Sequence, residues 1–149
     1  MRLQGKTALI TGAGRGIGLE FARAYIAEGA TVALADINGE AVAAATASLG
    51  PNAHGIVMDV TVQASIEAGF ASVIRQLGKL DILVNNAALF SAAPIVEITR
   101  ADFDKLFAVN VATYLVFLAV LPGMPSGRVH SALPRAERPG LVDVFQDGF

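Results

Sequence analysis

The chain has 149 residues, of which 54% are hydrophobic and 16% are charged, and its formal net charge is −2. This composition predicts one globular domain, excludes a disordered chain, and argues against nucleic acid as a partner. The absence of cysteine excludes disulfides and thiolate metal sites. No signal-peptide pattern opens the chain, and the longest apolar run, Val111–Leu121, is about half of the roughly 20 residues that a membrane span needs. We therefore expect a cytoplasmic protein with no membrane contact.

Short apolar runs alternate with segments of helical periodicity along most of the chain. In chain order we expect a strand at Thr7–Thr11, a helix at Ile17–Glu28, a strand at Thr31–Asp36, a helix from the cap Asn38 to Leu49, a strand at His54–Val60, a helix from the cap Thr61 to Leu77 (stopped by Gly78), a strand at Leu80–Asn85, and a helix from a Thr99/Asp102 capping box to about Leu121. This order predicts an α/β fold, a Rossmann-like doubly wound parallel sheet truncated after about four strands.

The alternation ends at Pro122. Residues 122–149 are rich in proline and glycine and lack helical periodicity, and only Leu141–Phe145 has the composition of a strand. We therefore divide the chain into a Rossmann region, residues 1–121, and an atypical tail, residues 122–149.

A glycine-rich turn, Thr11–Gly18 (TGAGRGIG), joins the first expected strand to the first helix. It departs from Gly-x-Gly-x-x-Gly in either register but fits Thr-Gly-x-x-x-Gly-x-Gly. Gly12, Gly16 and Gly18 then stand where the chain must reverse, offer bare backbone to a diphosphate, and let the helix pack close to the sheet. The N-terminus of the helix adds free N–H groups and a positive dipole end. We predict a dinucleotide diphosphate site here; the alternative is a glycine-rich turn without a ligand.

Asp36, at the end of the second expected strand, bears on the choice between NAD(H) and NADP(H). A carboxylate there accepts hydrogen bonds from the ribose hydroxyls and repels a 2′-phosphate. Arg15 in the glycine turn favours the opposite choice, because a guanidinium group can bind a 2′-phosphate. We give more weight to the direct repulsion and predict NAD as the cofactor; the alternative for Asp36 is a turn residue at a strand end.

Several separated features occur in the order and at the spacing of one family: the turn TGAGRGIG, Asp36, the pair Asp59–Val60, the stretch Asn85–Ala88 (NNAA), and Asn110. On these residues the chain, from about Leu3 to Leu121, resembles the N-terminal half of the short-chain dehydrogenase/reductase family. Residues 81–111 further resemble its polyol (sorbitol) dehydrogenases. The resemblance implies NAD(H) binding by residues 1–121, and reversible NAD-dependent oxidation of a small secondary alcohol or polyol as the family reaction.

The resemblance also implies roles for single residues. Asp59 would accept from the amino group of the adenine and Val60 would border the ring, although Asp59 could instead be a helix-capping acid. Asn110 corresponds to an asparagine that holds a water in the family's proton relay; a buried polar residue that ties a helix turn together is an equal alternative. The expected cofactor residues are Gly12, Arg15, Gly16, Ile17, Gly18, Asp36, Ile37, Asp59, Val60, Asn86, Ala87 and Ala88, the last being a glycine in most of the family.

The family's proton-transfer residues are missing from the sequence. That chemistry uses a serine, and a tyrosine followed four positions later by a lysine. Four residues beyond Tyr25 and Tyr114 stand Gly29 and Leu118, and the lysines all lie upstream of where the motif belongs. Neither serine of the tail, Ser126 or Ser131, sits in a fifth-strand motif. We predict that the chain binds NAD(H) and is catalytically incomplete.

Two alternatives stay open, a non-catalytic nucleotide-binding module and an orphan fragment that needs a partner chain. The second rests on Val111–Leu121, an apolar helix expected to cause self-association if its face is exposed. The two histidines, His54 and His130, show no ligand spacing, so we predict no metal site.

Overall fold

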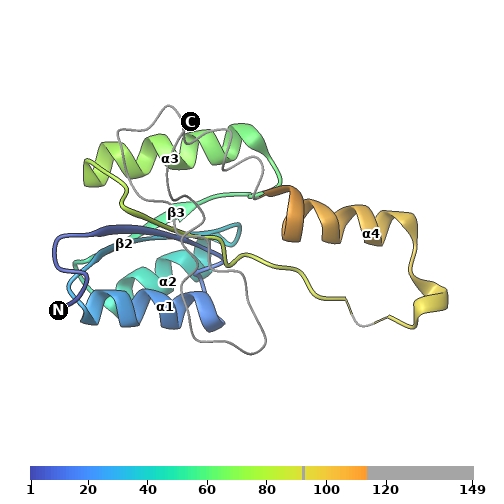
Figure 1. The fold of residues 1–149 in the computed structure, drawn as a ribbon, viewed down its shortest axis with the longest axis horizontal. Coiled ribbons are helices and arrows are strands. Elements are labelled where there is room, and N and C mark those ends of the chain that lie inside the picture. The colour runs from blue at the N-terminus through green and yellow to red at the C-terminus, as the bar shows by residue number, and fades with distance from the viewer. Residues whose placement is uncertain (92, 114–149) are drawn as a thin grey trace, which may run out of the picture.

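The computed structural model describes residues 1–91 and 93–113 (Figure 1). The predictions for Tyr114, for the apolar helix as far as Leu121, for Ser126 and Ser131, and for the tail at 122–149 lie outside the described residues.

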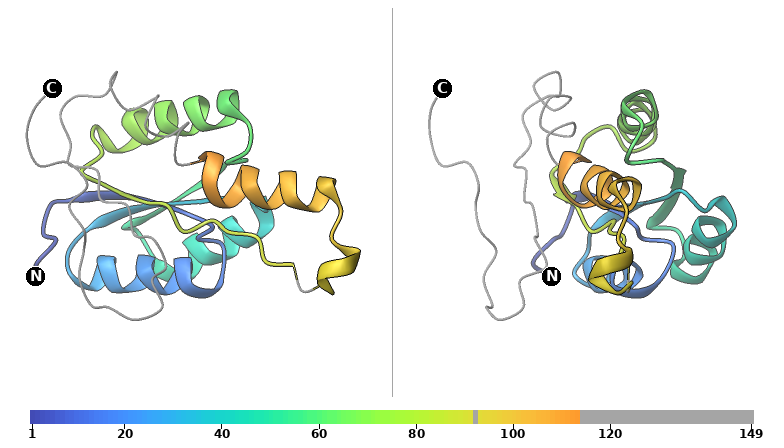
Figure 2. Two further views of the ribbon diagram at one scale, coloured as in Figure 1. Left: turned by 45° about the vertical axis from the view of Figure 1, so that its right-hand side comes forward. Right: turned by 90° about the vertical axis from the view of Figure 1, so that its right-hand side faces the viewer.

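The described elements alternate between strand and helix, as the sequence predicts. They are β1 (Thr7–Thr11), α1 (Gly16–Ala27), β2 (Thr31–Asp36), α2 (Gly39–Leu49), β3 (Ala53–Val57), α3 (Gln63–Leu77), β4 (Ile82–Val84), the 3₁₀ turn η1 (Ile95–Glu97), α4 (Arg100–Phe107) and the π-helical turn η2 (Ala108–Ala112). The four strands form one parallel sheet in the order β3-β2-β1-β4. Helices α1 and α2 cover one face and α3 the other (Figures 1 and 2), which confirms the doubly wound Rossmann-like fold.

The position of β1 in the sheet explains why its sequence contains no charged residue. Its side chains alternate between two cores, with Ala8 and Ile10 packed on the side of α1 and α2 and Leu9 on the side of α3. Phe70 of α3 lies in the second core and is 1% exposed. Because β1 is an inner strand of the sheet and both its faces are covered, every one of its residues is buried.

The predicted helix signals near Asn38, Gly78 and Thr99 are confirmed. The side chain of Asn38 accepts from the N–H of Ala41 at 3.0 Å, and Gly78 ends α3 in the left-handed conformation. Thr99 and Asp102 form the complete capping box of α4. These three signals depend on neighbouring residues alone, so the sequence is sufficient to find them.

Three predicted boundaries are wrong. The third strand ends at Val57 rather than Val60, because its partner strand ends there too: the last pair in their register is Asp36 with Val57. The fourth strand is limited to Ile82–Val84. The N-cap of α3 is Val62 rather than Thr61, which donates instead to Asp59.

The last described helix changes geometry along its length. Helix α4 gives way at Ala108 to the π-helical turn η2, where the sequence predicts one continuous helix. Figure 2 shows α4 beyond the end of the sheet rather than packed over one of its faces. No helix within residues 1–91 and 93–113 is long and apolar enough to span a membrane.

Candidate functional site

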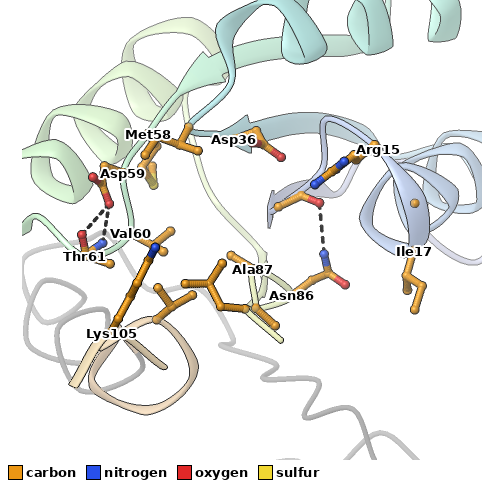
Figure 3. A pocket seen from close by; sticks show the side chains of 16 residues that line it. Arg15, Ile17, Asp36, Met58, Asp59, Val60, Thr61, Asn86, Ala87 and Lys105 are labelled. Atoms are coloured by element: carbon orange, nitrogen blue, oxygen red, sulfur yellow. Dashed lines mark hydrogen bonds between the residues drawn. The ribbon is translucent and has the colours of Figure 1, made fainter. Parts of the chain in front are cut away.

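A cavity of about 610 Å³ opens at the carboxyl end of the sheet (Figure 3). This is the end at which doubly wound sheets bind ligands, beside the point where β1 separates β2 from β4. The cavity is lined by Gly12, Arg15, Gly16, Ile17, Asp36, Ile37, Met58, Asp59, Val60, Thr61, Asn86, Ala87, Ala88, Leu89, Lys105 and Val109. All the predicted cofactor residues except Gly18 are therefore brought together in one place.

The glycine turn needs its glycines for different reasons. Gly12 and Gly16 have φ values of 63° and 58°, in the left-handed region that side chains with a Cβ rarely adopt. Gly18 lies behind the cavity wall, where a Cβ would stand 2.6 Å from the Asn86 amide nitrogen and even closer to the carbonyl oxygen of Gly12. The backbone around Gly16 is open, with no atom within 4 Å of an added Cβ. The turn thus offers uncovered backbone to the cavity while its base is tightly packed.

Asn86 fixes this turn to the end of β4. Its amide nitrogen donates to the carbonyl oxygens of Thr11 at 2.9 Å and Gly12 at 3.2 Å. In return, the hydroxyl of Thr11 accepts from the N–H groups of Asn86 and Ala87, each at 3.1 Å. Asn86 therefore positions the turn as well as lining the cavity.

Asp36 faces the cavity from the end of β2 and holds two loop segments. One carboxylate oxygen accepts from the N–H of Gly14 at 3.1 Å, and the other accepts from the N–H of Asn38 at 3.1 Å. Each oxygen keeps a second lone pair for a further donor. An added Cβ at Gly14 would lie 3.1 Å from the carboxylate of Asp36, so this glycine is needed for the contact. The motif alone did not single out Gly14, because its contact is with Asp36, which lies at the end of a different strand.

The opposite wall of the cavity is formed by the loop after β3 (Figure 3). One carboxylate oxygen of Asp59 accepts from the N–H of Thr61 at 2.8 Å and from its hydroxyl at 2.7 Å. Within the described part of the chain, no hydrogen bond reaches the other oxygen of Asp59. Across the cavity, Ile37 is 66% exposed and Ile17 is 70% exposed. These two apolar side chains present surface that a flat ring or a sugar could cover.

Asn110 does not line the cavity. It is held in η2, where its side-chain oxygen accepts from the N–H of Leu89 at 2.8 Å and its amide donates to the carbonyl of Leu89 at 2.9 Å. The side chain therefore ties this helix to the segment after β4 rather than to its own helix turn. Its part in a proton relay stays a prediction.

Five cavity-lining residues were not predicted: Met58, Thr61, Leu89, Lys105 and Val109. Lys105 in α4 and Val109 in η2 are four residues apart along one continuous helical segment, and this spacing is the signal that could have found them. Lys6 and Lys79 lie elsewhere and pair with Asp81 at the amino end of the sheet. Within residues 1–91 and 93–113, no group of three or more His, Cys, Asp or Glu side chains could hold a metal ion.

Comparison with known proteins identifies the family. The family model described as short chain dehydrogenase matches residues 6–131. The chain belongs to this family. It is 52% identical to a sorbitol dehydrogenase of Cereibacter sphaeroides over 97% of its length, and 49% identical to a galactitol 2-dehydrogenase of Agrobacterium fabrum over 74%. These matches confirm the resemblance to polyol dehydrogenases of the short-chain family.

The structural comparison gives the same family. The chain superposes on the crystal structure of an NAD⁺-bound xylitol dehydrogenase with a TM-score of 0.80 and 34% identity, over 88% of this chain and 54% of that one. The chain itself spans 59% of the length of the sorbitol dehydrogenase and 43% of that of the galactitol 2-dehydrogenase.

Proposed function

We propose that the chain binds NAD(H) in the cavity at the carboxyl end of the sheet. The observation that carries the proposal is the bare turn between β1 and α1, where Gly16 leaves the backbone open and Gly18 allows the turn to close behind it. The N-cap residue of α1, Arg15, makes no side-chain capping bond, and Arg15, Gly16 and Ile17 line the cavity, so the first N–H groups of the helix would serve as phosphate donors there. The diphosphate would rest there, as the sequence predicts.

The two ends of the adenosine would be held by the two acidic side chains of the cavity. Asp36 would accept from the ribose hydroxyls with the lone pairs that Gly14 and Asn38 leave free. The oxygen of Asp59 that Thr61 does not occupy would accept from the amino group of the adenine. A further unit of negative charge about 4 Å from Asp36 would cost about 1 to 4 kcal/mol, so this arrangement favours NAD(H) over NADP(H).

The reaction of the whole protein would be NAD-dependent oxidation of a small alcohol or polyol. The names of the sorbitol, galactitol and xylitol dehydrogenases support this substrate class. The bound nicotinamide would supply the hydride acceptor. We further propose that these 149 residues by themselves do not turn over a polyol, because no Tyr-x-x-x-Lys occurs in the sequence. We also propose that the chain self-associates through Val111–Leu121 and that it is cytoplasmic.

Fluorescence titration of the chain with NADH and NADPH tests the proposal, together with an assay for NAD⁺ reduction by sorbitol. We expect saturable NADH binding, weaker NADPH binding, and no turnover. Asp36→Asn should raise NADPH affinity relative to NADH about tenfold or more, because it removes the repelling charge. The matched control is Asp104→Asn, which removes the same charge from an exposed pair with Arg100 outside the cavity.

Each part of the proposal can fail separately. If the wild-type chain binds neither dinucleotide, the assignment of the cavity is wrong. If Asp36→Asn changes the NADH-to-NADPH ratio no more than Asp104→Asn does, the role of Asp36 is wrong. If sorbitol oxidation saturates with substrate, the claim of catalytic incompleteness is wrong.

A further inference from the structure

Thr113 follows the π-helical turn η2 and reaches from it to the loop after β3. It is 3% exposed, and its hydroxyl lies 3.0 Å from the carbonyl oxygen of Val60 and 2.9 Å from that of Ala108. The two carbonyls belong to different parts of the fold, one to the cavity wall and the other to its own helix. Thr113 is therefore the point at which this helix contacts the backbone beside the expected adenine site.

The hydroxyl of Thr113 has one proton and two neighbouring acceptors. The carbonyl of Ala108 already accepts from the backbone N–H of Thr113, which closes the π-helical turn. For the carbonyl of Val60, the hydroxyl of Thr113 is the hydrogen-bond donor that the described structure provides. The proton is therefore worth more at Val60, because leaving a part-buried carbonyl without a donor costs more free energy than leaving one that already accepts a hydrogen bond.

The position of Val60 matters for the cavity. Its side chain lines the cavity between Asp59 and Thr61. Helix α3 does not begin until Gln63, so no helical hydrogen bond fixes the carbonyl of Val60. The N–H groups of Thr61 and Val62 both bond back to Asp59, so they shape the loop locally, whereas the contact from Thr113 comes from a distant part of the chain. Thr113 thus connects the segment against which a base would pack to the helix on the other side of the cavity wall.

We propose that Thr113 is a positioning residue for recognition of the cofactor's base, acting through the carbonyl of Val60. Its hydroxyl holds the loop so that Val60 and the free carboxylate oxygen of Asp59 meet the adenine together. The π-helical turn serves this contact, since it brings the hydroxyl past its own helix to the loop. This inference rests on the proposed function, because it needs a dinucleotide in the cavity.

The test compares NADH with reduced nicotinamide hypoxanthine dinucleotide, which carries an oxygen in place of the adenine amino group. Both are titrated by fluorescence into the full chain as wild type, Thr113→Val and Thr113→Ser. The wild type should prefer NADH, because Asp59 accepts from an amino group and repels an oxygen. Thr113→Val should reduce this preference about fivefold, and Thr113→Ser, which keeps the hydroxyl, should retain it.

The ratio of the two affinities separates positioning from stability. A variant that is merely less stable loses affinity for both dinucleotides by the same factor, so its preference is unchanged. An unchanged preference in Thr113→Val, or a wild type without any preference, overturns the inference. Should Thr113→Val not fold, Thr113→Ala removes the hydroxyl without placing a methyl in its position, and the same criterion applies. A wild type that binds neither dinucleotide refutes the proposed function instead.

Discussion

Gly16 and Gly5 have the same left-handed backbone conformation but lie in different parts of the fold. Their φ values are 58° and 71°, and an added Cβ would meet no atom within 4 Å at either position. Gly16 lines the cavity at the N-terminus of α1, whereas Gly5 lies in the exposed turn before β1. An alanine at either position therefore introduces the same backbone strain without a clash. The pair isolates what a methyl group does to a ligand.

We expect Gly16→Ala and Gly5→Ala to lower Tm by the same amount, but only Gly16→Ala to weaken NADH binding. The left-handed conformation costs an L-residue about 1 to 2 kcal/mol. For a chain of this size, each 1 kcal/mol lowers Tm by roughly 2 to 4 °C, so both variants should lose about 2 to 8 °C. A methyl at Gly16 would also separate the diphosphate from the backbone. The loss of one charge-assisted hydrogen bond, about 1.5 to 3 kcal/mol, would weaken NADH binding about 10- to 100-fold.

The measurement is an NADH titration of both variants well below the lower of their Tm values, with Tm itself taken from thermal unfolding. Gly5→Ala should bind NADH like the wild type. If Gly16→Ala also does, the diphosphate does not lie on this turn, and the glycines serve only to connect β1 to α1. A selective loss of Tm in Gly16→Ala would show instead that the strain is not matched.

Two further predictions concern the frame around the cavity. Burial alone would raise the pKa of Asp81, but the hydrogen bonds from Lys79 and the Thr7 N–H, with the charges of Lys79 and Lys6, lower it below the ordinary value of 3.8. A carboxyl group whose pKa is lowered in the folded state stabilises the fold at pH values above its ordinary pKa. Urea midpoints should therefore fall as the pH drops from about 4 through the folded pKa, and Asp81→Asn should flatten this dependence. An unchanged pH dependence in Asp81→Asn would refute this role of Asp81. Thr99→Ala should lower the free energy of unfolding by about 1 kcal/mol and speed amide hydrogen exchange in the first turn of α4, with exchange in α1 unaffected. Faster exchange throughout the chain would contradict a local capping role.

The fold was predictable because its signals are local or periodic. The unbroken run of small and apolar residues in β1, without a charged side chain, indicates a strand covered on both faces. The caps at Asn38 and Thr99 depend on hydrogen bonds three residues along the chain. The end of β3 was not predictable in this way. Met58 and Val60 continue the apolar pattern, but β2 has ended at Asp36, so beyond the bond from the Met58 N–H to the Asp36 carbonyl this segment has no strand to pair with. The length of a strand is set by its neighbour as much as by its own sequence.

Sequence motifs were sufficient to find the residues of the candidate site, but not the hydrogen bonds that hold these residues in place. The motif residues converge, yet the hydrogen bonds that hold them there join positions far apart in sequence, such as Asn86 with Gly12 and Asp36 with Gly14. Lys105 and Thr113 were missed for the same reason, since neither belongs to a sequence motif and both depend on where α4 and η2 meet the sheet. Pairings across strand ends need the fold before they can be seen.

Binding and proton transfer require different properties of a side chain, and the described residues supply those for binding. Asp36, Asp59 and Asn86 are held by backbone hydrogen bonds and keep their polar atoms toward the cavity. Tyr25, by contrast, packs against the core beneath α1, and burial raises its pKa, which opposes the ionised form that a base needs. Lys105 reaches the cavity from α4 without a tyrosine four positions before it. We propose that a chain with these properties would order a dinucleotide without moving the proton of an alcohol, so retained NADH affinity and absent turnover would have one structural cause.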